Sequence, residues 1–221
     1  MVHGRRWIIW AVGAACALGV VSAGLAGVAG ARAAITPPTP TFAKTVVLTP
    51  IRGTVSILRP GAHGLFRVIV TSTVVPVGTM VDTTAGRVKL TSADPGRTPA
   101  KLQTGQFFRG VFQVRQDRRA GGLVNLVIRD NLNRSVCGAS AARAAAVNRR
   151  VLGLLRGTAK GRFRTAGRFA AATVRGTDWG VRDRCDGTLT VVRRGVVVVR
   201  DFRLHKTVTV RAGQTYLAKA S

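Results

Sequence analysis

Polar and apolar residues alternate in short segments along most of the chain, and this period of two predicts β-strands. Residues 106–115 are the clearest case, with Phe108, either Val111 or Phe112, and Val114 expected on the buried face and Gly110 as a candidate bulge. Residues 92–100 contain Asp-Pro-Gly and predict a loop. Further strands are expected at residues 46–48, 53–58, 65–70, 86–90, 123–128, 161–165 and 169–175, with a short strand and a bend at 74–81.

Near the end of the chain, apolar β-branched segments flank glycine-containing turns. Residues 188–193 and 196–200 lie on either side of Gly195 and predict a hairpin. Residues 207–211 and 215–218 flank Ala212-Gly213 and are expected to close the domain. The number and regular spacing of the strands predict an all-β fold, mainly an antiparallel sandwich or roll.

One window departs from the β pattern. Residues 140–155 begin with Ser140, a suitable N-cap, and continue with a run of Ala and Arg that favours helix. Val147, Val151 and Leu154 add a partial apolar stripe at helical spacing. The window therefore predicts a short helical insertion, either packed on the β-core or a partly ordered surface segment, with a basic recognition helix as the functional alternative.

The first 33 residues have the layout of a secretory signal. Arg5 and Arg6 precede an uncharged stretch at residues 7–31, and Ala31-Arg32-Ala33 then offers a small-x-small cleavage site before Ala34. The uncharged stretch is also long enough to cross a bilayer of about 30 Å as a helix. Residues 1–33 are therefore expected to be a signal peptide or a membrane anchor, and both alternatives place the rest of the chain outside the cytoplasm, secreted or anchored.

The remaining chain is expected to form a linker and one domain. Residues 34–44 are rich in Pro and Thr and predict an extended linker. Residues 45–221 then form a single β domain. Cys137 and Cys185 lie in it, and one cysteine pair in an exported chain predicts a disulfide, worth roughly 4 kcal/mol in the chain-entropy model.

The chain is strongly basic, with a formal net charge of +27 from 35 Lys and Arg against 8 acidic residues, all of them Asp. Such a charge favours a polyanionic partner: nucleic acid, anionic lipid headgroups or an acidic wall polymer. The alternative is a solvated basic surface that reflects a GC-rich coding sequence. Nucleic acid is the least favoured partner, because the chain is expected to be exported and only 5% of its residues are aromatic.

The order of motifs in the last third of the chain resembles the FecR domain. The resemblance includes a strand, a hairpin turn and a final Ala-Gly-Gln, and its residues are Val174, Arg175, Gly176, Thr177, Trp179, Gly195, Ala212, Gly213 and Gln214. It implies an extracytoplasmic β-rich domain, which would be residues 45–221. The best-known members relay a transporter signal to a sigma factor, whereas this chain is more similar to stand-alone exported members, since only its first six residues would lie inside.

The motif residues are expected to have structural roles. Gly176, Gly195 and Gly213 should lie at turns or bulges that need positive φ. Trp179 should be an anchor in the core or at its rim, with contact to a ligand as the alternative.

Three carboxylates lie close together in sequence, at Asp178, Asp183 and Asp186. Oxygen ligands in this number suit Ca²⁺, but the spacing is not that of an EF-hand, and the interleaved Arg182 and Arg184 favour local ion pairs instead. The chain has no Glu and no nucleophile, zinc or phosphate-loop motif. We therefore expect no catalytic residues, no cofactor and no bound metal.

Two functions fit these expectations. The first is a non-catalytic binding or signalling module of the FecR type with an unknown envelope protein as partner. The second is a structural or adhesive envelope protein that binds an anionic polymer through its arginines. The membrane would be contacted only through residues 7–31, if these are not cleaved.

Overall fold

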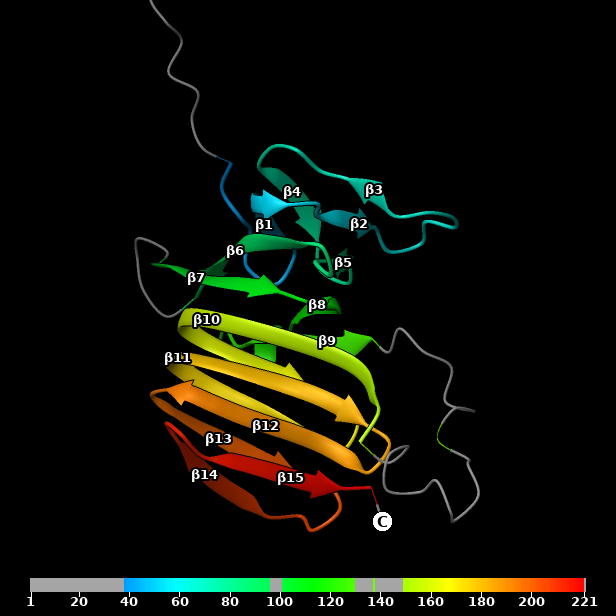
Figure 1. Ribbon diagram of the computed structural model, residues 1–221. Helices are drawn as coiled ribbons and strands as arrows, with labels where there is room; N and C mark the ends of the chain where they lie inside the picture. Colours follow the sequence, from blue (N-terminus) through cyan, green and yellow to red (C-terminus); the bar gives the residue numbers. More distant parts are fainter. Residues whose placement is uncertain (1–37, 96–100, 130–136, 138–148, 221) are drawn as a thin grey trace, which may run out of the picture. The chain divides into compact units, whose positions relative to one another are not determined.

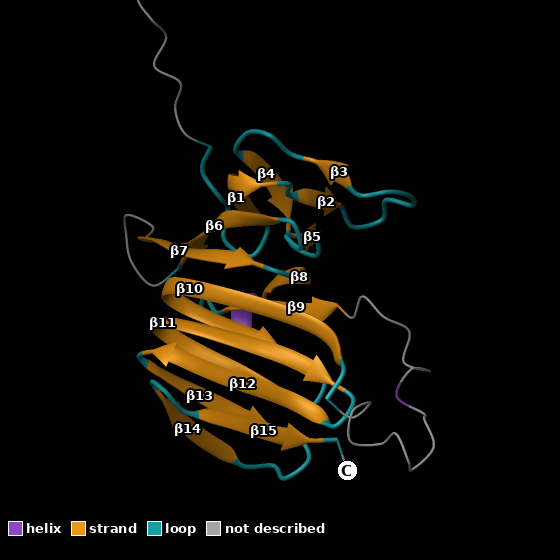
Figure 2. Ribbon diagram, viewed as in Figure 1, coloured by secondary structure: helices purple, strands orange, loops and turns teal. Residues whose placement is uncertain are grey.

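The computed structural model describes residues 38–95, 101–129, 137 and 149–220, and most of this part of the chain is strand (Figures 1 and 2). The strands are β1 (Thr45–Gly53), β2 (Ser56–Leu58), β3 (Arg67–Val68), β4 (Thr73–Pro76), β5 (Met80–Asp82), β6 (Gly86–Asp94), β7 (Lys101–Phe108), β8 (Val111–Gln116), β9 (Val124–Arg129), β10 (Val151–Ala166), β11 (Ala170–Arg184), β12 (Gly187–Arg194), β13 (Val196–Asp201), β14 (Thr207–Arg211) and β15 (Thr215–Lys219). A 3-10 turn, η1 (Arg118–Ala120), joins β8 to β9. The prediction of a mostly β structure is confirmed.

All these strands belong to one curled sheet with two branches. In the β7 branch, β4, β1, β6 and β7 lie in that order, and β7 pairs with β10. In the β9 branch, β3, β2, β5, β8 and β9 lie in that order, and β9 pairs with β10 as well. The strand pairs are antiparallel except β9 with β10, which run parallel.

The two branches are connected because β10 and β11 each change partner halfway along (Figure 1). β10 pairs with β7 over residues 156–160 and with β9 over residues 163–166. A bulge between Ala159 and Arg162 separates the two halves, and Gly161 within it has φ +128°, a backbone conformation that suits glycine. β11 pairs with β13 in its first half and with β12 in its second half. β14 pairs with β13 and β15 pairs with β12, so β14 and β15 extend different branches.

The inner faces of both branches share one apolar core. Phe107 on β7 lies at its centre, with its ring centroid 5.8 Å from that of Phe112 on β8 and 5.5 Å from that of Phe163 on β10. Trp179 on β11 donates from its indole Nε1 to Thr165 Oγ1 across the core at 3.1 Å. The buried aliphatic residues around these rings include Val46, Leu48, Val81, Val88, Leu90, Val114, Leu126, Leu155, Val181 and Val192. Burial of both inner faces is the main favourable contribution to folding.

The helical insertion predicted for residues 140–155 is wrong over residues 151–155, which form the start of β10. Leu152 and Leu155 are buried there, and the backbone pairs with β11. Helix propensity is a weak preference that such tertiary pairing overrides. Residues 140–148 of the insertion and the predicted N-terminal helix lie outside the described residues. In the described part of the chain, no helix has the length and apolarity needed to cross a membrane.

Three further expectations need correction. Residues 106–115 form two strands, not one, because the chain turns at Gly110 from the β7 branch to the β9 branch. In the first of these strands, Phe107 faces the core instead of Phe108. Residues 92–94, expected in a loop, extend β6. β12 and β13 do not pair as a hairpin around Gly195, because each pairs with a different half of β11.

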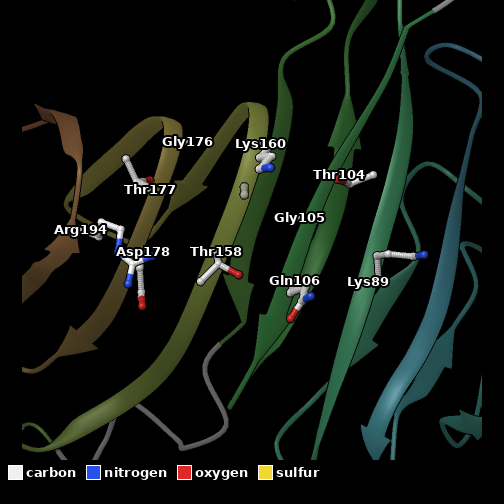
Figure 3. A pocket seen from close by; sticks show the side chains of 11 residues that line it. Lys89, Thr104, Gly105, Gln106, Thr158, Lys160, Gly176, Thr177, Asp178 and Arg194 are labelled. Carbon is white, nitrogen blue, oxygen red and sulfur yellow. The ribbon is translucent and has the colours of Figure 1, made fainter.

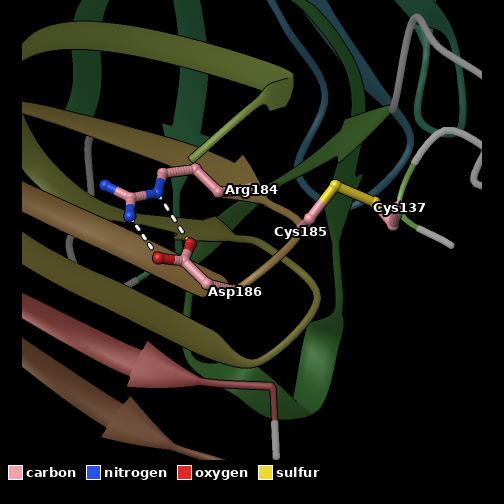
Figure 4. The surroundings of a disulfide bond; sticks show 4 residues. All are labelled: Cys137, Arg184, Cys185 and Asp186. Atoms are coloured by element: carbon pink, nitrogen blue, oxygen red, sulfur yellow. Dashed lines mark hydrogen bonds and ion pairs between the residues drawn. A yellow bond between two sulfur atoms is a disulfide. The ribbon is translucent and has the colours of Figure 1, made fainter. Parts of the chain in front are cut away.

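The predicted disulfide is present. Cys137 and Cys185 are joined with their Cα atoms 5.4 Å apart and 48 positions apart in sequence (Figure 4). Cys185 belongs to the turn between β11 and β12, where Arg184 and Asp186 form an ion pair. The bond therefore attaches the segment between β9 and β10 to this turn.

We expect that replacing both Cys137 and Cys185 with Ser lowers the free energy of unfolding by about 4 kcal/mol, because the unfolded chain regains the entropy of an open loop. Urea unfolding followed by circular dichroism measures the difference. Reduction of the wild-type protein with dithiothreitol should lower the free energy of unfolding by the same amount. Equal stability of the double variant and the wild-type protein would contradict the assigned bond.

A buried carboxylate organises the turn after β13. Asp201 is 1% exposed and accepts hydrogen bonds from the backbone N–H groups of Arg203 and Leu204 and from the Tyr216 hydroxyl. Burial alone would raise the pKa of Asp201, but these hydrogen bonds outweigh it and hold that pKa below its ordinary value of 3.8. Burial and the same carboxylate raise the pKa of Tyr216.

Because the pKa of Asp201 is lower in the folded state, its contribution to stability is complete above the unfolded pKa and is lost as the pH falls through the folded one. Asp201→Asn should therefore cost about 1–3 kcal/mol at pH 7 and less near pH 3. Urea unfolding at both pH values measures this. Tyr216→Phe, which removes one donor, should have the smaller effect. A cost for Asp201→Asn that is equal at both pH values would rule out this account.

Candidate functional site

The outer surface of the β7 branch is strongly basic. Strands β6, β7, β10, β11 and β12 lie side by side in it, and alternation points every second side chain away from the core. We call this surface the basic face and define it by the residues Arg87, Lys89, Phe108, Arg156, Lys160, Asp178, Arg182, Arg193 and Arg194. Asp178 is the acidic member of this set.

Two arginines of the basic face stack on one aromatic ring. Arg87 on β6 and Arg156 on β10 are the cross-strand neighbours of Phe108 on β7. Their Cζ atoms lie 4.1 Å and 5.2 Å from the centroid of the ring. Exposed cation–π contacts of this kind are worth about 0.5–1 kcal/mol each. Arg87 Nη1 also donates to Gln106 Oε1 at 3.3 Å, and the other N–H groups on the edges of the two guanidinium groups can donate to an anion.

Like charges crowd around Arg156. Partial burial lowers the pKa of Arg156, and the positive charges of Arg193, Arg109 and Arg182 lower it further, while Asp178 acts in the opposite direction. A guanidinium keeps its proton in such surroundings. The mutual repulsion therefore persists, and an anion bound among these side chains would relieve it.

A hollow of about 440 Å³ lies on the same face (Figure 3). The small residues Gly105, Ala159 and Gly176 contribute to its lining, and Lys89, Lys160 and Arg194 supply cations. The remaining lining is polar and consists of Thr104, Gln106, Thr158, Thr177 and Asp178. The hollow thus combines three cations with hydroxyl, amide and carboxylate groups.

Five of these residues form a straight row across the strands. The register places Lys89 opposite Gln106, Gln106 opposite Thr158, Thr158 opposite Asp178, and Asp178 opposite Arg194. Strands in a sheet are about 4.8 Å apart, so the Cα atoms at the two ends of this row are roughly 19 Å apart. We call it the cross-strand row, and it has a cation at each end.

A second hollow of about 580 Å³ lies beside β2 and β3 and has a different character. Its lining is mainly apolar, with Arg59, His63 and Arg67 at intervals. The segment that follows β2 exposes Leu65 to 91% and Val70 to 85%. Exposed apolar groups of this size are typical of contact surfaces for other macromolecules.

The three motif glycines lie close together, where β11 changes partner and where β12 and β14 end. Gly176, Gly195 and Gly213 have φ values of +69°, +80° and +82°, as expected for turn glycines. Gly195 cannot accept a side chain, since a Cβ there would lie 2.7 Å from Thr177 Cγ2. The Ala212 backbone N–H donates to the Gly195 carbonyl at 3.0 Å.

The remaining motif residues lie on β11 or in the turn after β14. Trp179 is 1% exposed and packs on Phe107. This confirms that Trp179 is an anchor in the core, as predicted, and does not support the alternative that its ring contacts a ligand. Val174 is also buried, and Arg175 pairs through its backbone with Arg162. Gln214 Oε1 accepts from the backbone N–H of Arg211 at 2.9 Å.

The three clustered aspartates do not converge on a common point. Asp183 is buried and accepts from the Arg168 backbone N–H and from the Thr188 hydroxyl. Asp186 pairs with Arg184, which confirms the local ion pair there (Figure 4), whereas Asp178 belongs to the basic face. In the part of the chain that the structure describes, no three potential metal ligands come together.

The sequence did not identify Phe108 or its two arginines as a site. Arg87, Phe108 and Arg156 come from three separate segments and meet only through the pairing of β6, β7 and β10. The alternation of Arg87 and Lys89 with buried Val88 was the one local signal of an outward basic strand. Comparison with known proteins adds no relative, because no family model, curated protein or solved structure matches the chain.

Proposed function

We propose that this protein is a non-catalytic extracytoplasmic binding module that holds an anionic polymer on its basic face. The observation that carries the proposal is the stack of Arg87 and Arg156 on Phe108, with Arg193 and Arg182 close by. A protein gains nothing in stability from crowding like charges on a surface strand. An anionic partner supplies the compensating charge.

The shape of the face suits an extended ligand. The basic residues lie along five neighbouring strands instead of around one deep cleft, and the hollow among them is open and bordered by charged and polar residues. Small-molecule pockets are usually enclosed and mostly apolar. A chain of repeating negative charges would contact several of these cations at once and release counterions as it binds.

The expected export of the chain supports a polymer of the cell envelope as the anionic ligand. The signal-like residues 1–33 and the disulfide both favour an oxidising compartment outside the cytoplasm. Polymers with phosphate or carboxylate groups in the cell envelope meet the requirement for repeated negative charge.

The proposal predicts the behaviour of two charge-matched variants. Arg87→Gln with Arg156→Gln should weaken binding of the full chain to inorganic polyphosphate about tenfold or more and lower the slope of log affinity against log salt by up to about 2. Arg200→Gln with Arg211→Gln, on β13 and β14, removes the same charge elsewhere and should change binding much less. Fluorescence anisotropy with labelled polyphosphate measures both.

Equal losses for the two double variants would mean that net charge, and not the basic face, controls binding. A wild-type protein that does not bind polyphosphate at low salt would overturn the proposal. Thermal unfolding of each variant controls for loss of structure.

A second candidate is signalling of the FecR type through an envelope protein. The clustering of the motif turns favours it, and the exposed Leu65 and Val70 offer an apolar surface for a protein partner. Release of bound material from immobilised protein by modest salt favours the polymer. Capture of one defined protein that resists salt, and that is lost in a Leu65→Asp, Val70→Asp variant, favours signalling.

A further inference from the structure

We infer that the polymer bound by the basic face carries free hydroxyl groups between its phosphates, and that Asp178 accepts a hydrogen bond from one of them. This inference names the ligand class for the same face and rests on the proposed function. It follows from the position of one carboxylate among cations and from the order of groups along the cross-strand row.

The side chain of Asp178 has a hydrogen-bond acceptor to which no group in the described residues donates. Its Oδ1 atom is buried and has no hydrogen-bond partner within the described residues. Asp178 lines the hollow, and its cross-strand neighbours are Thr158 and Arg194 (Figure 3). A buried acceptor that stays unpaired is unfavourable, so a donor from a ligand would improve the site.

A polymer with phosphates alone does not fit this atom. Phosphate oxygens of a polyphosphate chain only accept hydrogen bonds, and a second negative charge beside Asp178 would be repelled. A hydroxyl group is neutral and donates, so it suits a carboxylate acceptor. The hydroxyl of Thr177, 4% exposed and also unpaired within the described chain, lines the same hollow.

The cross-strand row suits a polymer that places phosphates at the row's two ends and hydroxylated units between them. Lys89 and Arg194 stand at its two ends and would each pair with a phosphate. Gln106, Thr158 and Asp178 lie between them and offer amide, hydroxyl and carboxylate groups. Side chains of this kind form hydrogen bonds with a polyol or sugar, which both donates and accepts.

The experiment compares two synthetic oligomers of equal length, a poly(glycerol phosphate) and the same molecule with its hydroxyls methylated. They carry the same charges at the same spacing and differ only in the donor. Binding to the full chain is measured by isothermal titration calorimetry at fixed ionic strength. The wild-type protein should bind the hydroxylated oligomer about tenfold more tightly than the methylated one, the factor expected for one hydrogen bond to a charged acceptor.

Asp178→Ala should change the two affinities in opposite directions. Binding of the hydroxylated oligomer should fall about tenfold because the acceptor is lost. Binding of the methylated oligomer should rise a few-fold because a repelling charge is gone. Asp178→Asn keeps the shape and a neutral acceptor, so it should lie between the wild-type protein and the alanine variant.

Asp186→Ala is the control with the same change of charge outside the hollow, and it should raise both affinities slightly or leave them unchanged. If Asp178→Ala raises both affinities equally, the hydrogen bond is refuted while the proposed function stands. If the wild-type protein binds neither oligomer and no polyphosphate, the proposed function fails together with this inference.

Discussion

Two long strands that change partner halfway along hold this structure together. β10 and β11 begin in one branch of the sheet and end in the other, so the inner faces of both branches close on one set of buried rings. Phe107, Phe163 and Trp179 lie at that junction. Every other strand is positioned, directly or through its neighbours, by pairing with this pair.

The basic face is a consequence of the same pairing. β10 brings Arg156 next to Phe108 because its first half lies along β7, and β6 brings Arg87 to the other side of the ring. The core beneath the face is dry and closely packed, which keeps these strands in fixed register. A rigid surface then presents its charges at regular intervals, a geometry that suits a repeating ligand better than a compact one.

Local sequence was a good guide to where strands occur and a poor guide to what they pair with. Alternation located most strands, and the positive φ expected for Gly176, Gly195 and Gly213 is present, with Gly195 and Gly213 at turns and Gly176 inside β11. The predicted hairpin at Gly195 failed because its two strands pair with opposite halves of β11, a contact that depends on residues far away in sequence.

The errors at residues 106–115 and 151–155 have the same origin. Phe107 and Phe108 are both suited to a strand, and the turn at Gly110 decides which one faces the core. Residues 151–155 continue an Ala- and Arg-rich window, but pairing with β11 selects strand. For the candidate site, the sequence supplied the charge and not its arrangement, because Arg87, Phe108 and Arg156 are neighbours only in the folded protein.

The parallel alignment of β9 with β10 has a consequence for synthesis on the ribosome. Antiparallel neighbours can form from a short turn, but β10 pairs with β9 only after its first half has passed along β7. A nascent chain that ends before β10 therefore has open edges on both β7 and β9, and unpaired edges of this kind invite association with other chains. Until β10 emerges, the first half of the domain needs shielding, and a chain kept unfolded for export would postpone the hazard to the far side of the membrane.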